Sequence, residues 1–301
     1  LGPNGSWAAL MKVEPSRPSD CLNGLRVLSM IWVILGHGLT QPLLVSGFRN
    51  AECVKKTPFC LDAYSTNPLI DILFAGDCGV DTFFFIGGFL LSYVGMSRSV
   101  PVIMGTVLRY ARLLPCLGFV MMVYVLIAPY WTFGPFSPRF QNDVFNNCSN
   151  NTWWAELLFI SAFFPWSNPK ACMGWSWYLG LDMLFAILGL AMLNVWKKLP
   201  VTAWAMVFIM TAASLAVTIQ QVLHYDMQYS LFGAHEGNYQ FHLYIKFYPR
   251  LPVFFVGLCA PWAMPSSEAG AVPRSRRATA LVMLGCLVAV AVGACCIFLP
   301  A

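Results

Sequence analysis

The sequence predicts an all-α fold, a polytopic transmembrane helix bundle of about seven spans. Of its 301 residues, 58% are hydrophobic and only 10% are charged, and the mean hydropathy is +0.65. A soluble domain of this length cannot bury so much apolar surface. Long apolar runs also recur along the chain, and the loops between them hold most of the basic residues. These observations favour an integral membrane protein.

Seven apolar runs define the expected spans, each close to the ~20 residues that a helix needs to cross a bilayer. In order, they cover residues 27–45, 72–95, 102–127, 175–196, 201–223, 251–264 and 278–299. The sixth run is short unless it includes residues 245–248. Residues 153–166 are too few to span, and their tryptophans suit an interfacial or re-entrant segment.

The chain is organised as a cytoplasmic linker, residues 1–20, followed by one membrane domain, residues 21–301. It begins with Leu1 rather than methionine and stops just after an apolar run. We therefore expect a fragment of a longer protein, truncated at the carboxyl terminus.

Basic residues predict the orientation. With a cytoplasmic amino terminus, the arginine and lysine clusters that flank the expected spans fall on one side, as the positive-inside rule requires. These are Arg17, Arg26, Arg98, Arg109, Arg112, Lys197, Lys198, Arg274, Arg276 and Arg277. This orientation is opposite to that of seven-span receptors, which disfavours that class.

The loop between the third and fourth spans has the features of an outer loop. It contains two N-glycosylation sequons, at Asn147 and Asn150, which mark a lumenal or extracellular position. Cysteines on that oxidising side form disulfides, and we expect the pairs Cys148–Cys172 and Cys53–Cys60. The histidines of the next outer loop match no metal-site spacing, so no metal is expected.

Arg26 and His37 stand out because both belong to the first apolar helix. Eleven residues at ~100° each make about three turns, so the two side chains share a face, ~16 Å apart along the axis. An ionisable group at membrane depth is costly and indicates function. The alternative is structural: a histidine hydrogen-bonded inside the bundle and an arginine anchored at the interface.

Further charged residues lie in or beside other spans. Arg109 and Arg112 share a helix face at the cytoplasmic mouth and suit phosphate groups, although positive-inside anchoring explains them equally well. In the second span, Asp81 is a better functional candidate than Asp77. Asp182, in the fourth span, needs a partner or an aqueous cavity, and Arg250 is our candidate for that partner.

Several motifs in this order resemble membrane-bound acyltransferase family 3, and specifically its animal-type, nose-resistant-to-fluoxetine branch. The similarity extends from about Asp20 to the end of the chain. The motifs are Asn23-Gly24-Leu25-Arg26 with His37, Val80-Asp81-Thr82-Phe83-Phe84-Phe85 with Gly88-Phe89-Leu90, Arg109-x-x-Arg112, Trp175-Ser176-Trp177-Tyr178-Leu179 with Asp182-Met183, and Tyr248-x-Arg250. Two departures are Gly87, where a serine is usual, and the absence of the last few spans.

The resemblance implies an integral-membrane O-acyltransferase. Such an enzyme moves an acyl group from cytoplasmic acyl-CoA, its co-substrate, to a hydroxyl acceptor on the outer side, with no tightly bound cofactor. By this resemblance His37 would be catalytic. Our own hypothesis is that Asp81 or Asp182 fixes the tautomer of His37 or raises its basicity. Arg26, Arg109, Arg112 and Arg250 would bind substrate. The alternative is a transporter or lipid-handling protein that keeps the fold without the chemistry. In either case we expect the chain to lie in the plasma membrane or an endomembrane. We expect no nucleic acid as a partner.

Overall fold

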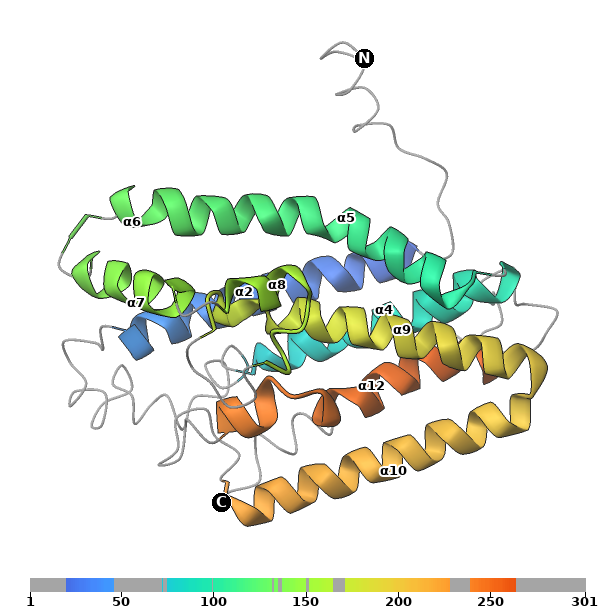
Figure 1. Ribbon diagram of the computed structural model, residues 1–301. Coiled ribbons are helices and arrows are strands. Elements are labelled where there is room, and N and C mark those ends of the chain that lie inside the picture. Colours follow the sequence, from blue (N-terminus) through green and yellow to red (C-terminus); the bar gives the residue numbers. More distant parts are fainter. Residues whose placement is uncertain are drawn as a thin grey trace, which may run out of the picture. The chain divides into compact units, whose positions relative to one another are not determined.

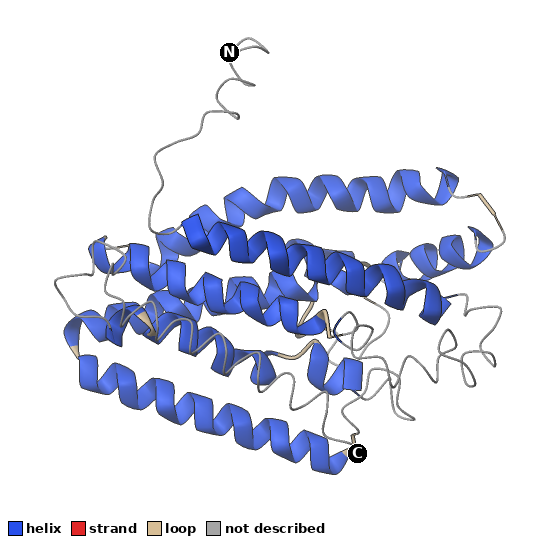
Figure 2. Ribbon diagram, turned by 180° about the vertical axis from the view of Figure 1, so that it is seen from behind, coloured by secondary structure: helices blue, strands red, loops and turns tan. Residues whose placement is uncertain are grey.

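The computed structural model describes residues 20–45, 72, 75–98, 100–131, 133–134, 137–149, 152–164, 171–227 and 239–263. Every regular element in these ranges is helical (Figures 1 and 2), which confirms the all-α prediction. Within the described residues, five helices are long and apolar enough to cross a membrane. The count of about seven spans is therefore not confirmed, and the run 278–299 lies outside the described residues.

The chain divides into two compact units, and the first includes residues 1–79. Its described part is α2, Asp20–Val45, with the turn that leads into α4. Trp32 Nε1 donates a hydrogen bond to the carbonyl of Ile72, 2.5 Å away. A methyl group added at Gly79 would meet Val33 and Ser29 of α2, so glycine lets the two segments approach closely.

The second unit contains the rest of the bundle. Its elements are α4 (Asp77–Ser97), α5 (Val102–Met122), the π-helical turn η2 (Val123–Ile127), α6 (Ala128–Trp131), α7 (Ser137–Ser149), α8 (Trp153–Leu157), the 3₁₀ turn η3 (Gly174–Ser176), α9 (Trp177–Lys198), α10 (Pro200–His224), the π-helical turn η4 (Gln240–Tyr244), α12 (Phe247–Cys259) and η5 (Pro261–Ala263). α9 contacts α5, α10 and α12, and lies between α5 and α12 in Figure 1.

The helix boundaries follow the apolar runs closely, with informative exceptions. α5 continues through η2 and α6 to residue 131, so the third span is longer than expected. α12 has only 13 residues and is not among the candidate spans. The amphipathic helix α7 occupies the loop between the third and fourth expected spans, where no helix was predicted, because its polar sequence carries no span-like apolar run. Residues 153–157 form the short helix α8 of the expected interfacial segment.

Glycines permit close contact between α4 and α12. A methyl group at Gly88 would overlap the backbone of Phe254 and Leu258, and one at Gly257 would overlap the backbone of Phe85. Small residues are the usual means by which membrane helices approach this closely. α4 and α12 are therefore held together backbone to backbone, and both carry charged residues of interest.

A side chain compensates for the proline inside α12. Pro252 has no N–H, so the carbonyl of Tyr248, four residues earlier, loses its helical partner. The buried Ser214 of α10 donates its hydroxyl to that carbonyl instead. An unsatisfied carbonyl in an apolar setting is costly, so this hydrogen bond both preserves α12 and attaches it to α10.

Candidate active site

Two arginine–aspartate ion pairs join helices inside the second unit. The first connects α5 to α9, since Arg109 donates to both carboxylate oxygens of Asp182, from Nε at 3.0 Å and from Nη2 at 2.5 Å. A two-pronged contact of this kind uses the planar geometry of the guanidinium fully. Both side chains are largely withdrawn from solvent, at 25% and 17% exposure.

The second pair connects α12 to α4. Arg250 Nη1 donates to Asp81 Oδ2 at 2.7 Å, while Nε and Nη2 both donate to the carbonyl of Tyr244 at 3.3 and 3.2 Å. The guanidinium also lies 4.8 Å from the centre of the Tyr244 ring, a favourable cation–π distance. Arg250 thus connects η4 to α4.

These pairs correct the partner expected for Asp182. The sequence suggested Arg250, but Arg109 is its partner, and Arg250 pairs with Asp81. The expectation that Asp182 needs a partner is confirmed. Because Arg109 is engaged with a carboxylate, its positive charge is largely neutralised by that contact.

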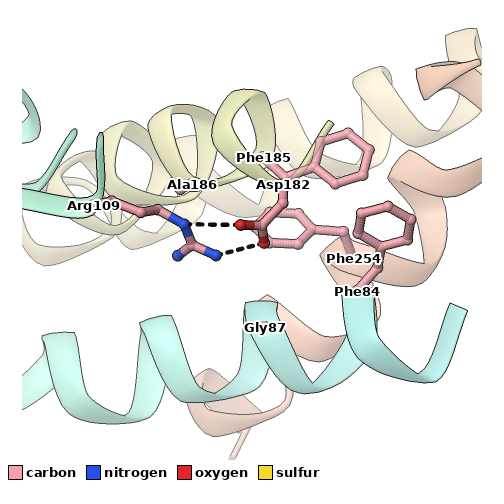
Figure 3. A pocket seen from close by; sticks show the side chains of 7 residues that line it. All are labelled: Phe84, Gly87, Arg109, Asp182, Phe185, Ala186 and Phe254. Atoms are coloured by element: carbon pink, nitrogen blue, oxygen red, sulfur yellow. Dashed lines mark hydrogen bonds and ion pairs between the residues drawn. The ribbon is translucent and has the colours of Figure 1, made fainter. Parts of the chain in front are cut away.

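A small hollow adjoins the first ion pair. Its cavity volume is about 10 Å³, room for roughly one water molecule, and it lies between α4, α5, α9 and α12. Figure 3 shows Arg109 and Asp182 on one side, with the aromatic rings clustered beyond the carboxylate. Its lining residues are Phe84, Gly87, Arg109, Asp182, Phe185, Ala186 and Phe254.

The aromatic wall is itself a packed cluster. The ring of Phe185 lies 5.1 Å from that of Phe84, edge to face, and 5.1 Å from that of Phe254, stacked. Phe84 also contacts Tyr178 at 4.8 Å. These spacings are those of favourable aromatic pairs, so the wall is rigid and apolar while the opposite side carries an ion pair.

In the first unit, Arg26 and His37 occupy the single continuous helix α2, as predicted. The His37 Nδ1 is 2.9 Å from the carbonyl of Val33. A carbonyl only accepts, so this contact places the proton on Nδ1 and leaves the lone pair on Nε2. In the described part of the chain, the His37 side chain is exposed and the Arg26 side chain is half-buried.

The remaining expected residues divide between described and undescribed parts of the chain. Arg112 is exposed on α5, one turn beyond Arg109. The sulfur atoms of Cys148 and Cys172 lie 2.11 Å apart, at disulfide distance. Asn147 lies in the last turn of α7 and is half-buried. Asn150, Cys53 and Cys60 lie outside the described residues.

Sequence reasoning missed a buried carboxyl group in the loop between the third and fourth expected spans. Glu156 of α8 is 2% exposed; its oxygens accept from the Ser176 hydroxyl and from the backbone N–H of Met173, the latter at 3.3 Å. Burial raises the pKa of Glu156, against the opposing effect of these hydrogen bonds. Glu156 thereby connects α8 to the turn that begins α9, the helix of Asp182. The sequence feature that could have indicated this burial is a single glutamate within an apolar, tryptophan-rich segment.

Lys246 is a second buried charge that the sequence did not single out. It precedes α12 and is 1% exposed, and burial lowers its pKa to about 8. Nearby, His242 stacks on Tyr225 with ring centres 4.1 Å apart. Among the described residues, no group of three or more potential metal ligands comes together.

Comparison with known proteins identifies the family. The profile of the acyltransferase 3 family, described as an acyltransferase domain, matches residues 19–299. The chain belongs to this family. No solved structure matches it significantly.

Two curated relatives come from Caenorhabditis elegans. Nose resistant to fluoxetine protein 6 is 26% identical over 293 residues, which cover 87% of this chain and 33% of that protein. Regulator of hypoxia-inducible factor 1 is 24% identical over 208 residues, which cover 68% of this chain and 40% of that protein. The chain spans between a third and two-fifths of the length of these relatives.

Proposed function

We propose that this protein is an integral-membrane O-acyltransferase that uses acyl-CoA as donor and a hydroxyl group as acceptor. The observation that carries the proposal is the family match over nearly the whole chain. The donor is cytoplasmic and the acceptor lumenal or extracellular, following the positive-inside orientation.

The donor phosphates bind to arginines at the cytoplasmic side. Arg112 is exposed on α5, and its guanidinium is suited to a two-pronged contact with phosphate. Arg109 is held by Asp182, so its role differs: it forms the polar edge of the hollow. Arg112 is therefore the principal phosphate ligand of the α5 pair.

His37 acts as the general base. Its Nδ1–H donates to Val33, so the lone pair of Nε2 is available to take a proton. Nε2 removes the proton of the acceptor hydroxyl as the oxygen attacks the thioester carbonyl. The carbon–sulfur bond then breaks, and the CoA thiolate leaves with the proton returned by the imidazolium. In this mechanism the backbone carbonyl of Val33 fixes the tautomer of His37, whereas we expected a carboxylate to do so from the sequence.

Release of free CoA by the purified protein in nanodiscs tests the proposal. Wild type should hydrolyse or transfer acyl groups from acetyl-CoA, and His37→Ala should lose at least ~100-fold in rate, as expected when a general base is removed. His224→Ala is the matched control, since His224 is also exposed at the end of an apolar helix. A His37→Ala protein with undiminished turnover would refute the proposed mechanism.

A second candidate, a transporter or lipid-handling protein, rests on the names of the relatives. These names refer to fluoxetine resistance and to regulation of a hypoxia factor, not to a reaction. A transporter would show flux across a vesicle membrane without any donor. Flux without acyl-CoA turnover in the same preparation would favour this function over acyl transfer.

A further inference from the structure

The end of α4 lies beside the turn between α9 and α10, and the two segments bring basic side chains together. Lys197 Nζ joins them, because it donates to the carbonyls of Gly95 and Arg98 at 2.6 and 2.7 Å. We call residues 94–98 and 196–201 the basic corner. They include Arg98, Lys197 and Lys198 and no aspartate or glutamate, so the positive charge of the corner is not balanced within it.

Lys197 has a structural task, whereas the other two cations do not. The last carbonyls of a helix lack donors within the helix and carry partial negative charge. Lys197 binds two such carbonyls at the end of α4, which reduces their repulsion of an anion. The side chains of Arg98 and Lys198 are exposed and form no ion pair within the described residues. Their charges are therefore available to an external anion.

Exposed apolar side chains adjoin these charges. Val94 lies one helical turn before Arg98 and is 49% exposed, and Val201, three residues after Lys198, is 82% exposed. One turn of helix is ~5 Å long, so acyl chains that lie along α4 and α10 would bring a headgroup phosphate to the level of the cations. A surface with both properties suits a lipid, because a soluble anion would not use its apolar part.

Three tryptophans in contact mark this end of the helices as a membrane interface. The ring centre of Trp262 lies 5.5 Å from that of Trp196 and 5.7 Å from that of Trp204, and Trp196 directly precedes Lys197. Tryptophan is enriched at the level of the lipid headgroups, and α4, α9 and α10 are all candidate spans. In the expected orientation this end faces the cytoplasm, where anionic lipids give the membrane a negative surface.

We propose that the basic corner binds the headgroup of an anionic phospholipid of the cytoplasmic leaflet. The guanidinium of Arg98 can hold a phosphate group through two hydrogen bonds, and Lys198 supplies a second cation from α9. The acyl chains of the lipid lie along the apolar surface of α4 and α10. The lipid thereby links the end of α4 to the α9–α10 turn, and this role is independent of acyl transfer.

Native mass spectrometry of the whole chain in detergent measures the binding. Phosphatidylserine and phosphatidylcholine with identical acyl chains are titrated, so that only the headgroup charge differs. Each basic residue near a membrane surface strengthens the binding of anionic lipid roughly fivefold. Wild type should therefore prefer phosphatidylserine by about 25-fold. Arg98→Gln and Lys198→Gln should each lower this preference about fivefold, and the double variant should abolish most of it.

The double variant Lys55→Gln/Lys56→Gln is the matched control. These lysines lie outside the described residues, in the loop between the first two expected spans, and their removal changes the net charge equally. This control should keep the preference; an equal loss, or a wild type without preference, would overturn the inference. Unesterified CoA should leave the bound phosphatidylserine in place, and its displacement would assign the cations to donor phosphates instead. The single variants keep the test decisive if the double variant fails to fold.

Discussion

Replacing Asp81 by asparagine should destabilise the protein by leaving the buried charge of Arg250 without its partner. Asp81 is 28% exposed and Arg250 10% exposed. Removing one member of a fully buried pair costs about 3 to 5 kcal/mol. Asp81 is only partly buried, and asparagine still accepts one hydrogen bond, so the loss should be smaller. We therefore expect a loss of about 2 to 3 kcal/mol.

The loss is measurable as a melting temperature. At about 2 to 4 °C per kcal/mol for a domain of this size, Asp81→Asn should melt about 5 to 10 °C below wild type. A thiol-reactive dye suits the assay, because the buried free Cys259 becomes accessible on unfolding. Arg250→Gln should cost more, since it also loses the hydrogen bonds to Tyr244.

A double-mutant cycle separates the pair from its surroundings. The protein that carries both Asp81→Asn and Arg250→Gln has no charge left at these two positions, so its loss should be smaller than the sum of the single losses by at least ~1 kcal/mol. Asp226→Asn is the control, because it makes the same chemical change at an exposed site. Additive single losses, or an Asp81→Asn protein that melts with wild type, would refute a stabilising role for the pair.

Three further predictions concern other parts of the molecule. Gly88→Ala should lower the melting temperature by several degrees, because its methyl group overlaps α12, whereas Gly118→Ala should not; equal melting of the two would contradict the close helix contact. Mass spectrometry of unreduced peptides should find Cys148 joined to Cys172, and two separate free thiols would contradict the pairing. Because burial raises the pKa of Glu156 above its ordinary 4.5, its neutral form favours the fold, and its contribution is present below pH 4.5 and lost as the pH rises through the folded-state pKa. Wild type should therefore lose more stability than Glu156→Gln between pH 4.5 and 8, and parallel pH profiles would exclude the effect.

The long helices were predictable because the bilayer imposes a simple rule. A stretch of about 20 apolar residues has few alternatives to a spanning helix, so α9 and α10 match the expected 175–196 and 201–223 within two residues at either end. The short helix α12 does not follow this length rule. Its 13 residues are fewer than a span needs, and Pro252 removes a hydrogen bond that only Ser214 of another helix replaces.

The ion pairs could not be assigned from the sequence. Hydropathy places Arg109, Asp182 and Arg250 on their helices, but the choice of partner depends on how each helix is rotated and how closely its neighbours approach. Glycines set that approach here, and Gly88 and Gly257 bring α12 to α4, where Arg250 meets Asp81. The network around Glu156 was equally hidden, since its partners lie 17 and 20 residues away.

The hydrogen bonds around η4 affect how its backbone carbonyl oxygens can interact with cations. Irregular backbone turns its carbonyl oxygens outward, and rows of such oxygens are what cation-conducting filters use in place of water. Here the carbonyls of His242, Tyr244 and Tyr248 are each bound by a side chain, from Tyr248, Arg250 and Ser214 respectively. The guanidinium adds a fixed positive charge. At these three described carbonyls, the side-chain donors and the nearby guanidinium therefore oppose the binding of a metal cation.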